Sequence, residues 1–391
     1  MSRWRVEQLT FGTPEGRFHA HSYYDVPALD GTGRRALVHR MTFEGRQPEP
    51  EDEVEVGAVD LDAPGSWTPL GRSRAWSWQQ GPLAQWIAGG PEALWSDRDG
   101  DSFIGRVANV STGAERTLPR PIYALEPEGR FGLSLDMARI DAFRPGYGFP
   151  GGAGARVDER APPDIGVWRL DLGSGEARLI LALADAVAFL EATAPLLLRV
   201  RHRLGRMRFW FNHAKISPDG RRFTVKLRWR RPGGPWGDHM GVSLTASTDG
   251  GDLRLLTDGA SHVMWLDPGR LYLWRRGELA TFADTAPRGE RIERLLPTLV
   301  KDNVHIRALP PATVEGEARY VYDTPYREEV DLLIAEGERS ERLARFEGHR
   351  PAIGPFRCDL HPVPSADGRR ILVTSLADGG RQVYAVSRED G

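Results

Sequence analysis

The chain has 391 residues, with 52 Lys and Arg against 54 Asp and Glu, and it carries a formal net charge of −2. A balance this close to neutrality gives no support to a nucleic-acid or membrane partner. The single cysteine excludes an internal disulfide, and no stretch is apolar for long enough to span a membrane. The first residues lack the apolar core of a signal peptide, so a cytoplasmic protein is expected.

Short strand-like runs separated by turns follow one another along the chain. The first run is Arg5 to Phe11, and the remainder divides into cycles of strands, each roughly 40 to 60 residues long. From Phe223 to Arg228, apolar and polar residues alternate, which is the pattern of a strand with two unlike faces. Turns rich in Gly and Asp end the cycles. Cycles of this length are typical of β-propeller blades.

The repeat predicts an all-β fold, a seven-bladed β-propeller that forms a single domain over residues 1–391. One blade cannot bury both faces of its own sheet, so blades must pack on their neighbours. The last cycle supplies too few strands, and the N-terminal strand is expected to complete it and close the propeller. Two segments interrupt the repeat: an inserted Gly- and Pro-rich loop at about 141–163, and a short helix expected within Ala182 to Val200.

Histidines recur at one position of the repeat. NHAKISPDG, SHVMWLDPG and LHPVPSADG carry His213, His262 and His361, each seven residues before a glycine, and the looser copy VHIRALPPA carries His305. In a propeller, the innermost strand of each blade lines the central channel, so residues at the same repeat position of different blades face one another across it. The four imidazoles are therefore expected to converge at one channel mouth.

Converging imidazoles suit a divalent transition metal such as zinc, manganese or iron. We expect His262, His305 and His361 to bind the ion, with Cys358 as the fourth ligand and Asp359 as an alternative source of a donor atom. Three histidines with a thiolate would suit zinc, whereas oxygen ligands would also admit manganese. The opposing interpretation is that the repeated histidine is inherited structure, which caps each strand through a hydrogen bond.

Candidates for binding a substrate lie beside the histidines. Arg228 and Arg230 share a face of the strand after His213, where a guanidinium could pair with a carboxylate. Gln80, at the opening of the second cycle, could also reach the channel.

The insertion follows a strand expected at Phe131 to Ile140. It is expected to emerge at the histidine mouth and to bring Arg144 and Tyr147 towards a substrate, with Tyr147 as proton donor or base.

The histidine segments resemble a known group of enzymes. SPDGRRF after Asn-His, Ser-His-x-x-Trp, and Asp-x-His-Pro-x-x-Ser-x-Asp-Gly-Arg-x-Ile are similar to segments of β-propeller polysaccharide lyases. The oligogalacturonate lyases are the nearer match and the ulvan lyases a looser one, and the likeness is clearest from Asn212 to Tyr384. The resemblance implies a lyase that cleaves uronate-containing oligosaccharides by β-elimination.

The resemblance also implies roles for residues. Oligogalacturonate lyases hold a divalent metal through three histidines and a glutamine, and His262 and His361 match two of these positions. Val363 and Cys358 stand where a further histidine and the glutamine are expected. Ulvan lyases use a histidine and a tyrosine for acid–base work and an arginine beside the uronate, for which the nearest candidates are His213, Tyr147 and Arg228.

Two other classes of function stay open. A propeller can be a non-catalytic platform that binds a glycan or a protein partner, and the same histidines could serve a metal-dependent hydrolase or isomerase. Because propellers host all of these functions, the fold alone does not decide among them.

Overall fold

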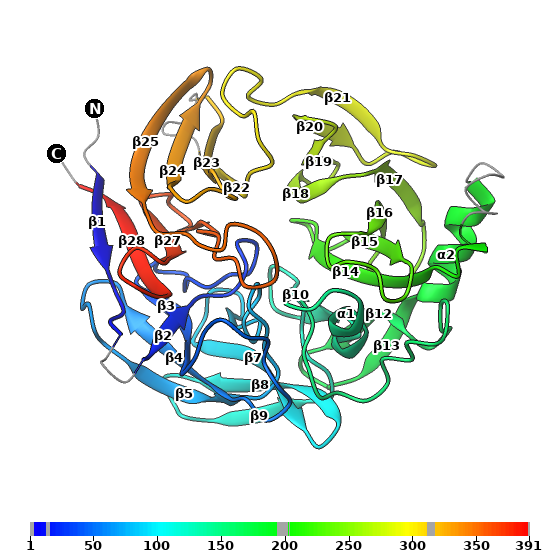
Figure 1. The fold of residues 1–391 in the computed structure, drawn as a ribbon, viewed down its shortest axis with the longest axis horizontal. Helices are drawn as coiled ribbons and strands as arrows, with labels where there is room; N and C mark the ends of the chain where they lie inside the picture. Colours follow the sequence, from blue (N-terminus) through cyan, green and yellow to red (C-terminus); the bar gives the residue numbers. More distant parts are fainter. Residues whose placement is uncertain (1–3, 13–15, 194–201, 203, 311–316, 390–391) are drawn as a thin grey trace. The chain divides into compact units, whose positions relative to one another are not determined.

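The computed structural model describes residues 4–12, 16–193, 202, 204–310 and 317–389. Its strands form seven four-stranded sheets in which neighbouring strands pair antiparallel. The helices whose bounds the structure gives are α1 (Met137–Phe143) and α2 (Leu183–Thr193). The seven sheets are the blades of a seven-bladed β-propeller, which confirms the predicted all-β fold (Figure 1).

The chain divides into two compact units. Unit 1 comprises Met1–Arg98, Gly105–Thr117 and Leu296–Gly391, and unit 2 comprises Asp99–Ile104 and Leu118–Leu295. The single-domain organisation of residues 1–391 stays a prediction.

Unit 1 carries four sheets, apart from the tip of the β7–β8 hairpin. The first two contain β2 (Phe18–Ala20), β3 (Arg35–Met41), β4 (Val54–Asp60) and β5 (Thr68–Ser73), then β6 (Gln85–Trp86), β7 (Glu92–Asp99), β8 (Ser102–Asn109) and β9 (Glu115–Leu118). The other two contain β22 (Ile306–Leu309), β23 (Arg319–Asp323), β24 (Val330–Glu336) and β25 (Arg339–Phe346), then β26 (Val363–Pro364), β27 (Arg370–Ser375) and β28 (Gln382–Arg388) with β1 (Trp4–Gln8).

Unit 2 carries three sheets. They contain β10 (Ala124–Leu125), β11 (Phe131–Ser134), β12 (Gly166–Asp171) and β13 (Ala177–Ala182); β14 (Arg208–Ile216), β15 (Arg222–Arg230), β16 (Met240–Ser247) and β17 (Arg254–Asp258); and β18 (Ser261–Asp267), β19 (Arg270–Arg275), β20 (Glu278–Ala283) and β21 (Glu290–Arg294).

The N-terminal strand completes the last blade. β1 pairs antiparallel with β28, with Trp4 opposite Arg388 and Gln8 opposite Tyr384 (Figure 1). This pairing is the predicted closure, although the strand ends at Gln8, three residues before the expected limit at Phe11. Since β28 would otherwise present an open edge, β1 satisfies its backbone groups and protects it from pairing with another chain.

The core of unit 1 lies between successive blades. Val38 and Val59 of one sheet pack with Leu372 and Ala385 of the next, and all four are buried. Trp86 is buried, and its indole N–H donates to the carbonyl of Ala28 over 3.0 Å. The packing of one sheet on another therefore stabilises each blade, as a propeller requires.

The insertion begins differently from the sequence prediction. The strand expected at Phe131 to Ile140 is wrong beyond Ser134, because β11 stops there and α1 begins at Met137. Met137, Ile140 and Phe143 are buried at a spacing that fits a helix, because residues three apart on a strand point to opposite faces. The helix predicted before Pro195 is confirmed as α2 over Leu183–Thr193, beside β13 (Figure 1), and residues 194–200 lie outside the described ranges.

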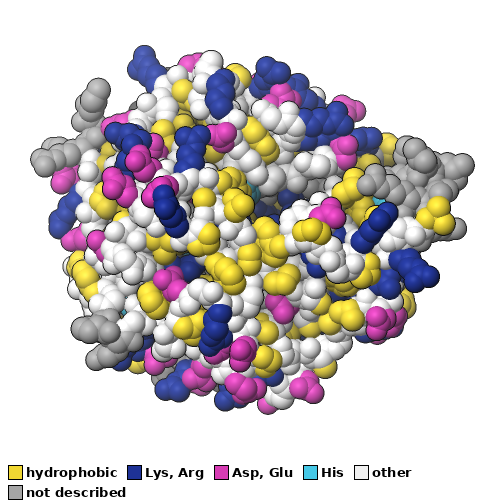
Figure 2. All heavy atoms as spheres, in the orientation of Figure 1, with side chains coloured by type: hydrophobic (Ala, Val, Ile, Leu, Met, Phe, Trp, Pro, Cys, Tyr) yellow, Lys and Arg dark blue, Asp and Glu magenta, His cyan; other side chains and the backbone are white. Residues whose placement is uncertain are grey.

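Charged side chains are mixed on the surface. On the face drawn in Figure 2, Lys and Arg alternate with Asp and Glu rather than gathering by sign, which agrees with the net charge of −2. In the described parts of the chain, neither helix has the length and apolar character needed to cross a bilayer.

Candidate functional site

A cluster of metal-ligand side chains lies in unit 1. His305, Asp359 and His361 are buried, and each offers a ligand atom within 4.8 Å of the others. Asp359 Oδ2 lies 3.9 Å from His305 Nε2 and 3.7 Å from His361 Nε2. These three residues, called here the His/Asp cluster, offer two imidazoles and a carboxylate, a donor set that fits manganese, iron or zinc.

Asp323, at the end of β23, orients His305. The His305 Nδ1–H donates to Asp323 Oδ2 over 2.9 Å, and the His305 backbone N–H donates to Asp323 Oδ1 over 2.9 Å. Burial lowers the pKa of His305, but the charges and hydrogen bond of Asp323 and the charge of Asp359 outweigh burial and raise it. With Nδ1 held in this way, Nε2 is the ring nitrogen that faces Asp359, as in carboxylate–histidine–metal arrangements.

An arginine already pairs with the carboxylate of the cluster. Arg357 Nε donates to Asp359 Oδ2 over 2.6 Å, and both side chains are buried. Aromatic rings form a wall beside the imidazoles, because Tyr23 lies 4.5 Å from His361 and Tyr24 lies 5.1 Å from His305, centroid to centroid. The cluster is therefore a preorganised and largely dry site, in which electrostatic interactions are strong.

The predicted ligand set differs from this cluster. Cys358 lies next to the cluster in sequence, but its Sγ contacts the carbonyl oxygens of Asp359 and Thr374, at 4.0 and 3.8 Å. Burial raises the pKa of Cys358 to about 12. The cluster contains Asp359 rather than Cys358, and His262 lies in unit 2, in β18. The roles of Cys358 and His262 as metal ligands stay predictions.

A second group of polar side chains surrounds His213 in unit 2. The register of β14 with β15 shifts between Asn212 and Lys215, and His213 has a left-handed φ of 55°. The Tyr123 hydroxyl donates to Asn212 Oδ1 over 3.2 Å and accepts from the His213 backbone N–H over 3.2 Å. The Tyr147 ring meets the imidazole edge-on, with centroids 5.4 Å apart.

Four cationic side chains act on this imidazole. Burial, followed by the positive charges of Lys226, Arg228, Lys215 and Arg144, holds the pKa of His213 well below its usual range. The imidazole is therefore neutral at pH 7. The four basic side chains, called here the basic cluster, come from β14, from β15 and from the segment after α1.

The insertion reaches the basic cluster through Arg144. Its guanidinium lies 4.5 Å from the Tyr147 ring and 4.9 Å from that of Trp236, and its NH1 donates to His239 Nε2 over 2.5 Å. Trp236 in turn donates to the carbonyl of Pro145 over 2.8 Å. The structure thus places Arg144 and Tyr147 beside His213, and both are buried.

The other residues predicted to bind a substrate are Arg228, Arg230 and Gln80. Arg228 stands opposite Trp210 in the β14–β15 ladder, and Arg230 donates to the carbonyl of Pro235 over 3.4 Å. Gln80 is buried in unit 1, between β5 and β6. The roles of these three residues in binding a substrate stay predictions.

The sequence analysis did not predict a role in either site for Lys215, Lys226 or Asp323. Lys226 was visible as a polar position within an alternating strand. Asp323 follows the apolar run of β23, but only the fold brings it to His305, since 17 residues lie between the two in the chain and β22 and β23 must pair first.

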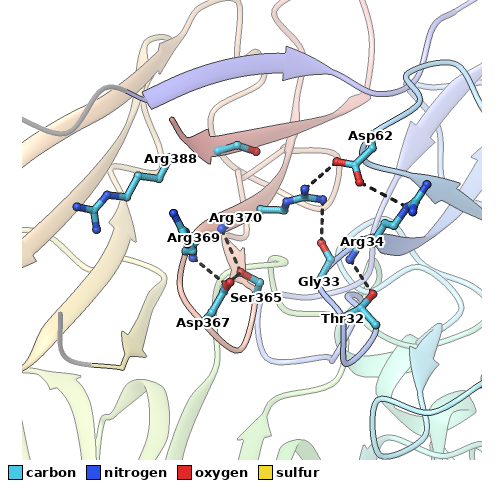
Figure 3. A pocket seen from close by; sticks show the side chains of 10 residues that line it. Thr32, Gly33, Arg34, Asp62, Ser365, Asp367, Arg369, Arg370 and Arg388 are labelled. Carbon is cyan, nitrogen blue, oxygen red and sulfur yellow. Dashed lines mark hydrogen bonds and ion pairs between the residues drawn. The ribbon is translucent and has the colours of Figure 1, made fainter. Parts of the chain in front are cut away.

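A surface pocket on unit 1 offers no comparable chemistry. It has a volume of about 580 Å³ and is lined by charged side chains of both signs (Figure 3). Arg370 pairs with Asp62 over 2.7 Å, and Arg34 reaches the same carboxylate over 3.4 Å. The lining has four arginines and two aspartates, and ion pairs across it join the first and last blades, so the pocket is best understood as a polar seam between these blades.

No protein-family model and no curated protein matches the chain. Its fold is similar to that of an oligogalacturonate lyase in complex with manganese, with a TM-score of 0.59 and 15% identity, over 100% of this chain and 99% of the other. An oligogalacturonate lyase from Vibrio parahaemolyticus is similar at a TM-score of 0.58 and 12% identity, over 98% and 97%. The expected resemblance to oligogalacturonate lyases is confirmed at the level of the fold, and that to ulvan lyases stays a prediction.

Proposed function

We propose that this protein is a carbon–oxygen lyase that cleaves uronate-containing oligosaccharides by β-elimination. The observation that carries the proposal is the surroundings of His213, where a neutral imidazole and the Tyr147 phenol lie in contact among four basic side chains. β-Elimination requires a cation for the uronate carboxylate, a group that removes the C5 proton and a group that protonates the leaving oxygen. Side chains of all three kinds are present.

The roles follow from the chemistry of these groups. Arg228 binds the uronate carboxylate, assisted by Arg144 and Arg230, because a guanidinium pairs with a carboxylate in bidentate fashion. Neutralising that charge makes the C5 proton more acidic and stabilises the enolate-like intermediate. His213 and Tyr147 carry out acid–base work, and the Tyr147 hydroxyl donates its proton to the glycosidic oxygen as the bond to C4 breaks.

The His/Asp cluster would hold a divalent cation through His305, Asp359 and His361. A bound ion supplies a Lewis acid that neutralises a carboxylate and stabilises developing negative charge. A carboxylate donor with imidazoles admits manganese as well as zinc. Manganese is also the metal named with the oligogalacturonate lyase of similar fold, and that neighbour favours an oligogalacturonate among the possible substrates.

The test is turnover of a panel of uronate oligosaccharides, followed by the ultraviolet absorbance of the new C4–C5 double bond. We expect the absorbance to grow with the wild-type protein and to slow by roughly 100- to 10,000-fold in His213→Ala and Arg228→Ala. Arg231→Ala is the control, because this exposed arginine lies three residues from Arg228 in the same run. It should keep the wild-type rate.

A flat trace across the panel would contradict the lyase. If calorimetry then showed that uronate oligosaccharides bind without being cleaved, the non-catalytic platform would be the better interpretation.

A further inference from the structure

The chain uses lysine sparingly. Among its 52 Lys and Arg residues, only Lys215, Lys226 and Lys301 are lysines. Two of the three are buried, and both belong to the basic cluster beside His213. Arginine stays protonated in proteins, whereas a buried lysine can lose its proton and act as a base. Nearly all basic side chains of this protein are arginines. The two buried lysines therefore suggest that these positions use a property that arginine lacks, the ability to become a neutral amine.

Arg139 shows how fully a buried permanent cation of this protein can be solvated. Arg139 has 1% of its surface exposed and donates to five backbone carbonyls, those of Phe209, Ala155, Arg156, Glu159 and Arg160. Lys226 is buried to a similar degree, with 6% exposed, yet within the described chain its Nζ makes one hydrogen bond, to the carbonyl of Ala260 over 2.7 Å. One acceptor satisfies a neutral amine and leaves its lone pair available, but it solvates an ammonium poorly.

The charges around Lys226 favour the same form. Burial, followed by the positive charges of Arg228, Lys215 and Arg144, holds the pKa of Lys226 well below its usual range. The groups whose charges act on Lys226 are Lys215 on β14, Arg228 on β15 and Arg144 after α1. The charge of Lys226 would in turn act on His213 on β14 and on His239 before β16. Desolvation beside other cations is a known way to activate a lysine.

Lys226 also stands at the right place in the sheet. It lies directly opposite Asn212 in the β14–β15 ladder, one residue from His213. From β15 its side chain reaches the segment that leads into β18, so it crosses between two blades of unit 2 next to the groups assigned to acid–base work.

We propose that Lys226 acts as a neutral amine and accepts the proton that the reaction removes from C5 of the substrate. This step rests on the proposed function. The Lys226 lone pair forms a bond to the C5 proton, and the C5–H electron pair becomes the C4–C5 double bond. The C4–O bond breaks with its electron pair on oxygen, which takes the proton of the Tyr147 hydroxyl. Lys226 thus ends as an ammonium and Tyr147 as a phenolate, and exchange with water restores both.

The direct test is a titration of the lysine side chains by nuclear magnetic resonance. Protein made with ¹³C-labelled lysine has three side-chain Cε signals, which Lys215→Arg, Lys226→Arg and Lys301→Arg assign by the loss of one signal each. We expect the midpoint of Lys226 to lie well below the value of about 10.4 for an ordinary lysine. A Lys226 midpoint at pH 10 or above would overturn the proposal, whatever the activity.

The second test of the proposal compares the rates at which lysine variants cleave the uronate oligosaccharides. Lys226→Arg puts a guanidinium that cannot be deprotonated where the neutral amine stood, so it should slow cleavage by roughly 100-fold or more, and its urea unfolding shows whether the variant is folded. Lys301→Arg should cleave at the wild-type rate. Persistent turnover in a folded Lys226→Arg variant would contradict the role of Lys226 alone, whereas a wild-type protein that cleaves no uronate would contradict the proposed function itself.

Discussion

Three of the repeated histidines share an unusual backbone conformation. His213, His262 and His361 have φ values of 55°, 47° and 48°, and Leu83, which stands seven residues before Gly90, has 55°. The pairing registers of β14 and β18 shift across His213 and His262, as they do at a β-bulge, which re-aims a side chain. The repeat position is thus a bulge of the blade, and Leu83 shows that it does not require histidine.

Sequence could therefore predict the position of these imidazoles but not their partners. The spacing of His361 from a glycine was visible, whereas the choice between Cys358 and Asp359 as its neighbour depends on which side chain turns towards it. Adjacent residues on an extended segment point in opposite directions, so a difference of one residue decides between thiol and carboxylate. His305 has no left-handed φ and is anchored by Asp323 instead, a partner that the repeat does not contain.

Asp323→Asn should weaken metal binding while leaving the fold intact. The amide no longer provides the charge that orients and polarises His305, so we expect the affinity for Mn²⁺ to fall by roughly 10- to 100-fold. Titration calorimetry on chelator-treated protein measures the loss, and Asp302→Asn is the control, because Asp302 is exposed and pairs with Arg327. Equal affinities in wild type and Asp323→Asn would contradict a metal at the His/Asp cluster.

At the level of elements, the alternation of apolar and polar residues and the Gly- and Asp-rich turns predicted the blades. These signals did not distinguish every strand from a short helix. Met137, Ile140 and Phe143 bury one face of α1 three residues apart, a spacing that fits a helix, because residues three apart on a strand point to opposite faces. Met137, Ala138 and Arg139 are also strong helix formers, so the local sequence favoured the helix that the strand assignment missed. Asp136, just before the helix, accepts the backbone N–H of Gly166 over 2.8 Å, which ties the start of α1 to β12.

Gly81→Ala should destabilise the protein more than Gly100→Ala. The two glycines have nearly equal left-handed φ values, 54° and 56°, so both substitutions introduce the same backbone strain. A Cβ on Gly81 would lie 2.3 Å from His39 Cε1, whereas one on Gly100 has no heavy atom within 4 Å. We expect a further loss of about 1–3 kcal/mol for Gly81→Ala from overpacking, measured by urea unfolding. Similar losses in the two variants would show that the His39 ring moves aside freely.

At the level of the whole molecule, buried neutral histidines link stability to pH. Burial, with smaller contributions from His21, Arg381 and His19, lowers the pKa of His39 to about 3. Burial likewise lowers the pKa of His19 to about 4, because its effect is larger than that of the hydrogen bond with Gln382, which raises the pKa. Between these values and about 6.5, the unfolded chain binds more protons than the folded one, so stability falls as the pH falls.

His39→Leu should reduce this dependence. Each such histidine lowers the free energy of unfolding by up to about 1.4 kcal/mol per pH unit within the window. Between pH 7 and pH 5 the wild type should therefore lose about 2 kcal/mol more than the variant, whatever the stability of each at pH 7. Urea midpoints at the two pH values provide the measurement. Equal losses would mean that His39 titrates at an ordinary pH.

The pairing of β1 with β28 also sets an order of events during synthesis. Trp4 lies opposite Arg388, so nearly the whole chain must be translated between the two strands. At roughly 5 to 20 residues per second, that interval is about 20 to 80 s. For all of it, β1 emerges from the ribosome without its partner, while the intervening blades form. A ribosome stalled before β28 would therefore carry a nascent propeller whose last sheet is incomplete and whose strand β1 is unpaired. Chaperones could bind both of these exposed parts.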